Sequence, residues 1–90
     1  MRYNLSYHHV DHSDAFEKFL NDKVDHLEHL MKGVRHIDFI ADKDSKDFKF
    51  SVNIKSNHNS FHSSGKAADL YQAASEVLPK MKSWLLSHSK

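Results

Sequence analysis

The feature that most constrains the fold of this sequence is a strict alternation of apolar and polar side chains between residues 48 and 55. Four apolar residues are each followed there by a polar one: Phe48, Lys49, Phe50, Ser51, Val52, Asn53, Ile54 and Lys55. A period of two is typical of a β-strand with one buried and one exposed face. The segment therefore predicts a strand in a sheet that is covered on one side only.

Three further segments show the same alternation over shorter lengths. They comprise residues 2–8, 36–41 and 61–64. The polar stretch Asp42–Asp47 predicts a connecting loop, and Asn57–Asn59 predicts a turn. The sequence therefore predicts four strands, three of them following one another directly.

Between the first two strands the hydrophobic period becomes that of a helix. Ser13 is a suitable N-cap residue, and Asp14 and Glu17 place negative charge in the first turn. Apolar side chains then recur every three or four positions: Phe16, Leu20, Val24, Leu27 and Met31. The pattern predicts an amphipathic helix that ends at Gly33.

A second helical period begins at about Lys66 and runs almost to the last residue. Its apolar stripe consists of Leu70, Ala74, Val77, Met81 and Leu85. Pro79 falls inside this stripe, and proline removes a backbone hydrogen bond from a helix interior. Because the apolar period continues past it, we expect a bend between Ser75 and Pro79 rather than the end of the helix.

The predicted order of elements is β-α-β-β-β-α in a single domain over residues 1–90. Each helix has one apolar stripe and each strand one apolar face. The economical packing is an α+β fold with both helices on one face of a four-stranded, mostly antiparallel sheet, as in double-stranded-RNA-binding domains. The opposite face of the sheet would then meet solvent or a partner.

Composition excludes several classes of protein. Hydrophobic residues make up 39% of the chain and the formal charge is only +1, which argues against a disordered chain. The chain has no cysteine and only 2 glycines, so a thiol nucleophile, a disulfide framework and a glycine-rich phosphate loop are all missing. We expect no enzyme, no cofactor and no small-molecule substrate.

The chain also has neither a long apolar run nor the apolar segment of a signal peptide near Met1. We therefore expect a cytoplasmic protein without a membrane partner.

Histidine is unusually frequent, at 9 of 90 residues. Three groups are close in sequence: His8, His9 and His12; His26 and His29; His58 and His62. None of them forms a known metal-binding motif, so solvent-exposed histidine is the favoured interpretation and no metal is expected. A fortuitous zinc or nickel site is the alternative.

Lys23 interrupts the apolar face of the first predicted helix. At about 100° per residue it falls between Phe16 and Leu27. A lysine in this place must extend its ammonium group to an edge or to the seam between the helices. The group would either simply reach water there or be held in position for a phosphate.

Taken together, the residues resemble the short ribosome hibernation-promoting factors, a family that includes ribosome-associated inhibitor A. In the first half of the chain the resemblance rests on Met1, Asn4, Val10, Ala15, Phe19, Lys23, Leu27 and Glu28. In the second half it rests on His62-Ser63-Ser64, Asp69-Leu70-Tyr71, Ala73, Lys80, Leu85 and His88. The resemblance covers nearly the whole chain at almost gap-free spacing.

The resemblance implies a function that composition does not show. Members of this family bind the small ribosomal subunit in the channel for mRNA and tRNA, and they silence ribosomes in stationary phase or stress. The implied partners are the 30S subunit with its 16S rRNA, 70S and 100S ribosomes, and a ribosome modulation factor. The chain also resembles the short type of this family, without a C-terminal dimerisation domain or acidic tail.

The resemblance also implies which residues contact rRNA: Lys23, His26, Lys80, Lys82 and His88. Lys23 and Lys80 match basic positions of the family directly, whereas His26 stands where relatives often have lysine. Relatives also carry basic residues where this chain has Ser83 and Ser87, so its basic stripe is thinned. Either other lysines supply enough attraction, or histidines replace lysines and binding strengthens as pH falls.

Two other function classes remain open at this point. A weakened basic face is compatible with a protein-binding module that has kept the fold and lost the ribosome. A free double-stranded RNA reader is less favoured, because the basic loop that it needs is missing. Tyr71 and Trp84 are candidate base-stacking platforms, but both border the apolar stripe of the second helix, so packing is the favoured interpretation.

Overall fold

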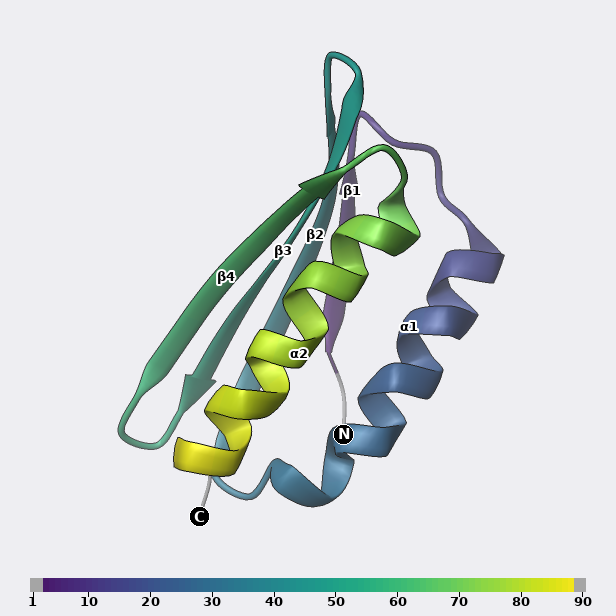
Figure 1. The fold of residues 1–90 in the computed structure, drawn as a ribbon. Helices are drawn as coiled ribbons and strands as arrows, with labels where there is room; N and C mark the ends of the chain where they lie inside the picture. Colours follow the sequence, from purple (N-terminus) through teal and green to yellow (C-terminus); the bar gives the residue numbers. More distant parts are fainter. Residues whose placement is uncertain (1–2, 89–90) are drawn as a thin grey trace.

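The computed structural model describes residues 3–88, and the side chains of residues 3–87 (Figure 1). The chain forms four strands, two α-helices and one 3-10 turn. In order they are β1 (Asn4–His8), α1 (Asp14–Leu27), η1 (Glu28–Leu30), β2 (Val34–Asp44), β3 (Asp47–Ser56), β4 (Ser60–Ala67) and α2 (Leu70–His88). This confirms the predicted order of elements. Arg2, the predicted start of the first strand, lies outside the described residues.

The four strands form one sheet in the order β1-β2-β3-β4. β1 runs parallel to β2, because α1 carries the chain back along the sheet between them, and the other two pairs are antiparallel. Leu5 lies beside Phe39, and Phe39 lies beside Val52, so apolar positions of neighbouring strands share one face. The sheet is therefore mostly antiparallel, and the α+β class is confirmed.

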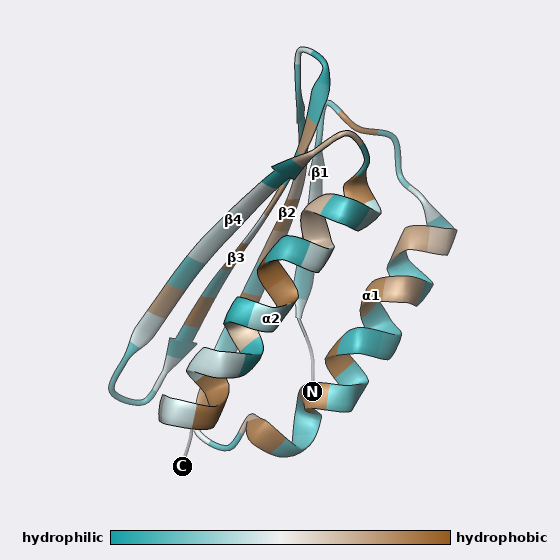
Figure 2. Cartoon of the chain, viewed as in Figure 1, coloured by the Kyte–Doolittle hydropathy of each residue, from teal (hydrophilic) through white to brown (hydrophobic). Residues whose placement is uncertain are grey.

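Both helices cover this apolar face of the sheet, and they begin at the same end of it (Figure 1). Their brown apolar sides face the strands, whereas teal polar residues cover the outer sides (Figure 2). Phe16 of α1, Phe39 of β2 and Phe50 of β3 are fully buried, and the rings of Phe39 and Phe50 stack with centroids 5.3 Å apart. One core thus joins both helices to the sheet.

The first helix begins as predicted and ends earlier. The Ser13 hydroxyl oxygen accepts a hydrogen bond from the backbone N–H of Phe16 at 3.1 Å, which is the expected N-cap. The α-helix stops at Leu27, a 3-10 turn follows, and Gly33 has a positive φ of 83°. The predicted helix was too long because Met31, although outside the helix, is still buried in the core and continues the apolar period.

The predicted loop over residues 42–47 is wrong. β2 and β3 continue through it to the paired residues Asp44 and Asp47, and only Ser45 and Lys46 form the turn. This hairpin extends beyond the helices (Figure 1), so both of its faces meet water. Without a buried side it has no apolar alternation, and the sequence pattern could not reveal the strands.

The last strand is longer than predicted, and the last helix starts later. β4 continues to Ala67, and Asp69 Oδ1 accepts a hydrogen bond from the backbone N–H of Gln72 at 2.9 Å in the first turn of α2. α2 then runs through Pro79 without a break, as predicted. Gly65 permits the close approach of α2 to β4, because a Cβ atom there would lie 2.7 Å from the Ala73 carbonyl oxygen.

Within residues 3–88, neither helix is long and apolar enough to span a lipid bilayer.

Candidate nucleic-acid interface

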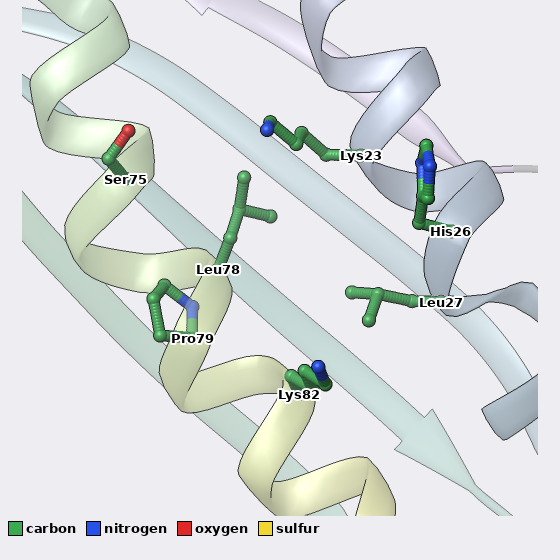
Figure 3. Close-up of a pocket in the computed structure, with 7 residues that line it drawn as sticks. All are labelled: Lys23, His26, Leu27, Ser75, Leu78, Pro79 and Lys82. Atoms are coloured by element: carbon green, nitrogen blue, oxygen red, sulfur yellow. The ribbon is translucent and has the colours of Figure 1, made fainter.

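A groove lies between α1 and α2 on the outer side of the helical layer (Figure 3). Its volume is about 510 Å³. Both helices contribute residues to it: Lys23, His26 and Leu27 from α1, and Ser75, Leu78, Pro79 and Lys82 from α2. Three of the predicted rRNA-binding residues, Lys23, His26 and Lys82, therefore line the same groove.

The floor of the groove is apolar. Leu27 and Leu78 are only 7% and 8% exposed, since they are the outermost members of the core stripes of their helices. The Pro79 ring lies beside Leu78 on the α2 side (Figure 3). The groove thus offers a ligand hydrocarbon surface below and polar groups at its rim.

Lys23 reaches the seam between the helices, as its place on the helical wheel predicted. Its side chain is exposed and points from α1 toward α2 (Figure 3). The Nζ atom lies 5.5 Å from the centroid of the Phe19 ring, a favourable distance for a cation–π contact. This contact holds the ammonium group at the rim, where it can meet an anion.

His26 and Lys82 complete the polar rim from opposite sides. The Nδ1 atom of His26 lies 2.7 Å from the backbone oxygen of Asp22, and because a carbonyl only accepts, Nδ1 donates. This bond orients the ring and leaves Nε2 for a ligand. Lys82 lines the groove from α2, whereas Lys23 lines it from α1 (Figure 3).

No carboxylate is among the groove-lining residues in the described part of the chain. The groove therefore carries two positive charges from Lys23 and Lys82, and a third when His26 is protonated. Binding of an anionic phosphate to such groups is favourable, since no carboxylate lines the groove with them. The arrangement selects an anion by charge and offers it an apolar neighbour.

Two predicted residues are not brought into the groove. Lys80 is exposed on α2 and lies about 160° around the helix from Lys82, so it occupies the other flank. On that flank Glu76 accepts a hydrogen bond from the backbone N–H of Lys66 at 3.2 Å. His88 is the last residue of α2, and its side chain lies outside the described part of the structure.

A second hollow, beside β4, has mixed charge. It is lined by Asp44, Lys49, Ser64, Gly65, Lys66 and Glu76. The Lys66 ammonium group is paired with the Asp44 carboxylate at 3.2 Å. Because acids and bases balance there, this hollow does not select an anion as the groove between the helices does.

Sequence reasoning missed the apolar floor and undervalued Lys82. The helical wheel of α2 alone shows that Lys80 and Lys82 lie on different flanks, but not which flank faces α1. One feature of the sequence could have revealed the groove. Leu27 lies at the edge of the apolar stripe of α1 near Lys23, and Leu78 lies at the edge of the apolar stripe of α2 near Lys82. To predict that these two stripe edges form one groove, one would have to know how both helices are oriented on the sheet.

The two proposed stacking platforms are packed against other rings, as favoured by the sequence. Tyr71 lies 5.0 Å from Phe19 between ring centroids and 5.4 Å from Phe16, although 40% of it remains exposed. Trp84 stacks on Phe61 at 5.3 Å. These rings close the ends of the helical layer rather than standing free.

The histidines are distributed over the surface. In the described residues no three metal-ligating side chains gather at one place. His12 lies 2.7 Å from Asp14 through Nε2 and 3.1 Å from Glu17 through Nδ1, and the hydrogen bond to Asp14 raises the pKa of His12 above its usual value. His62 pairs with Asn53 at 2.7 Å.

Comparison with solved structures finds the same fold elsewhere. The structure resembles that of a ribosomal subunit interface protein from Coxiella burnetii, with a TM-score of 0.83 and 16% identity over 98% of this chain and 97% of that chain. It also resembles the N-terminal domain of Protein Y from Thermus thermophilus, with a TM-score of 0.80 and 13% identity over 94% and 96% of the two chains. At these identities the likeness establishes the fold.

No curated protein sequence matches the chain. A family model does match, and it covers residues 3–90. Its description is sigma 54 modulation protein / S30EA ribosomal protein. Because the match spans nearly all 90 residues, the chain belongs to this family of ribosome-associated proteins.

Proposed function

We propose that the protein binds the small ribosomal subunit in the channel for mRNA and tRNA and thereby inhibits translation during stationary phase or stress. It acts as a steric plug, and no covalent bond is made or broken. The observation that carries this proposal is the groove that Lys23, His26 and Lys82 line together, with no carboxylate among its described lining residues. Family membership supports the ribosome as the partner.

The electrostatics of the chain favour a local contact over a general attraction to RNA. The formal net charge is only +1, so long-range attraction to phosphate is weak. Affinity must then come from places where positive groups are concentrated and acids are absent. The groove meets both conditions, whereas the hollow beside β4 does not.

The partners that follow from this proposal are the 16S rRNA of the 30S subunit and, through it, 70S and 100S ribosomes. A ribosome modulation factor would act with the protein where ribosomes pair. The working compartment would be the cytoplasm. Lys23, His26 and Lys82 would contact rRNA phosphates directly, with Lys80 and His88 on α2 as outlying contacts.

The test is co-sedimentation of the purified protein with 30S and 70S particles on sucrose gradients at low and high salt. Phosphate contacts release counterions, so wild-type binding should weaken steeply as salt rises. Lys23→Glu and Lys82→Glu should each abolish binding. Lys80→Glu is the matched control, because it makes the same charge change on the opposite flank of α2, and it should have a much smaller effect.

Two results would contradict the proposal. Absence of co-sedimentation at any salt between pH 6 and 8 would mean that the fold has been kept without the ribosome, as in a protein-binding module. Association that does not respond to salt would indicate an apolar protein interface instead of rRNA. An equal loss in all three variants would show that the contact surface extends beyond the groove to the Lys80 flank of α2.

A further inference from the structure

The groove has one property that phosphate binding alone does not explain, which is its apolar floor. Lys23 and Lys82 at the rim suit phosphate, but Leu27, Leu78 and Pro79 offer no hydrogen bond. The outside of an A-form RNA helix presents phosphates and ribose hydroxyls, whereas its base faces are stacked inside. A duplex lying across the rim would leave this hydrocarbon surface without a matching partner.

Resting on the proposed function, we propose that the groove binds a single unpaired nucleotide of RNA. The flat face of the base lies on Leu27 and Leu78, and its phosphate lies at the rim, where Lys23 and Lys82 supply positive charge. The protein would then recognise an unstacked residue of single-stranded RNA and discriminate against a regular duplex. Charge complementarity sets the orientation, since all the positive groups are at the rim and none is on the floor.

The size and the remaining rim groups fit this ligand. A volume of about 510 Å³ lies within the range of about 300–1,000 Å³ that small-molecule sites occupy. The bond of His26 to the Asp22 carbonyl occupies Nδ1, so Nε2 remains available for a ligand. Together with the Ser75 hydroxyl it can hydrogen-bond to a base edge or a ribose hydroxyl. Hydrogen-bonding groups at the rim and hydrocarbon below match the polar edge and apolar face of a base.

The direct test is an NMR titration of the 15N-labelled protein with adenosine monophosphate. Amide signals of residues 23–27, 75–78 and 80–82 should shift and saturate together. Ribose 5-phosphate, which lacks the base, should bind about tenfold more weakly, which corresponds to about 1.4 kcal/mol of lost base contact. Equal shifts with both compounds would overturn the proposal, because the floor would then contribute nothing.

A variant tests the same idea without changing any charge. Ser75→Leu fills the groove with a side chain and should weaken binding of a short unpaired RNA by about tenfold. Ser87→Leu is the matched control, because it makes the same exchange at another exposed position of α2, outside the groove. Unchanged binding by Ser75→Leu, or binding of a duplex as tight as that of the unpaired strand, would overturn the proposal.

These results remain separate from the proposed function. If the wild type sediments with 30S subunits but shows no preference for adenosine monophosphate, the ribosome proposal stands and the nucleotide site is refuted. If the nucleotide binds in the groove but the protein does not sediment with ribosomes, the nucleotide site stands and its natural RNA lies elsewhere.

Discussion

Lys23 of α1 and Lys82 of α2 line the same groove from opposite helices, and Leu78 lies between them in the view of Figure 3. Two ammonium groups that line one groove repel each other weakly, and the arrangement is stable because water screens the exposed charges. An anion that enters the groove removes the repulsion and gains attraction from both sides. The pair therefore gives the helical layer its clearest preference for phosphate.

The first prediction concerns the salt dependence of ribosome binding. Lys23→Gln and Lys82→Gln should each reduce the slope of log affinity against log salt by about 1, since each removes one phosphate contact. Filter binding or sedimentation with 30S subunits at several salt concentrations measures the slope. Lys80→Gln is the control, and a reduction as large as that of Lys82→Gln would show that the contact surface is not confined to the groove.

The second prediction concerns pH and His26. Imidazole is the side chain that ordinarily changes charge between pH 5 and 8, and His26 shares the groove with Lys23 and Lys82 while its Nδ1 donates to the Asp22 backbone oxygen. Protonation adds a third positive charge to the groove, so affinity for 30S subunits should rise between pH 8 and pH 6. About 1 kcal/mol from an exposed charge contact corresponds to roughly fivefold.

His26→Gln should remove this rise, whereas His29→Gln should keep it, because His29 is exposed outside the groove. Intact subunits must be verified at each pH. Affinity of the wild type that stays flat from pH 8 to pH 6 would refute a role for histidine in place of lysine.

The third prediction concerns His12 and the pH dependence of stability. Both ring nitrogens of His12 face carboxylates, with Asp14 at 2.7 Å and Glu17 at 3.1 Å, and the hydrogen bond to Asp14 raises the pKa of His12 above 6.5. A raised folded-state pKa stabilises the fold fully below pH 6.5, and this contribution disappears as pH rises through the folded value.

Replacement of His12 by Asn should therefore lower the denaturation midpoint more at pH 5.5 than at pH 8.5. Chemical denaturation at the two pH values measures the difference. His58→Asn serves as a control in an exposed turn. An effect of His12→Asn that is the same at both pH values would mean that the two carboxylates do not interact with the charged ring.

The fourth prediction concerns the contact between α2 and β4. A Cβ atom at Gly65 would lie 2.7 Å from the Ala73 carbonyl oxygen and 2.9 Å from the Glu76 side chain. Gly65→Ala should cost about 1–3 kcal/mol of unfolding free energy, because a backbone atom of the helix must move. Urea denaturation measures the loss, and Ser64→Ala on the opposite face of β4 should change little. A Gly65→Ala variant as stable as the wild type would show that α2 can shift freely.

Much of the fold could be predicted from the sequence because it depends on the regular spacing of apolar side chains within short segments. The alternation at residues 48–55 identified β3, and the stripe from Phe16 to Leu27 identified α1 together with its Ser13 cap. The core residues followed from the same periods. Errors occurred where the period was not informative, as in the hairpin turn at Ser45, whose flanking strands are exposed on both sides.

The candidate site was predicted only in part. Lys23 could be placed at the seam between helices, since it interrupts an apolar stripe, and the structure puts it there. Lys80 was chosen with Lys23 because both match basic positions of the family. The structure instead places Lys82 opposite Lys23 and leaves Lys80 on the far flank.

The sequence by itself determined which segments become helices and strands and which side chains are buried, because hydrophobic burial acts on patterns a few residues long. Only the tertiary structure decided that Lys82 and not Lys80 lines the same groove as Lys23. That choice depends on how α2 is rotated on the sheet, where Gly65 lets the helix approach β4 closely. The rotation of a helix about its axis is fixed by contacts between segments that are distant in the sequence. The spacing of apolar residues within the helix therefore does not predict it.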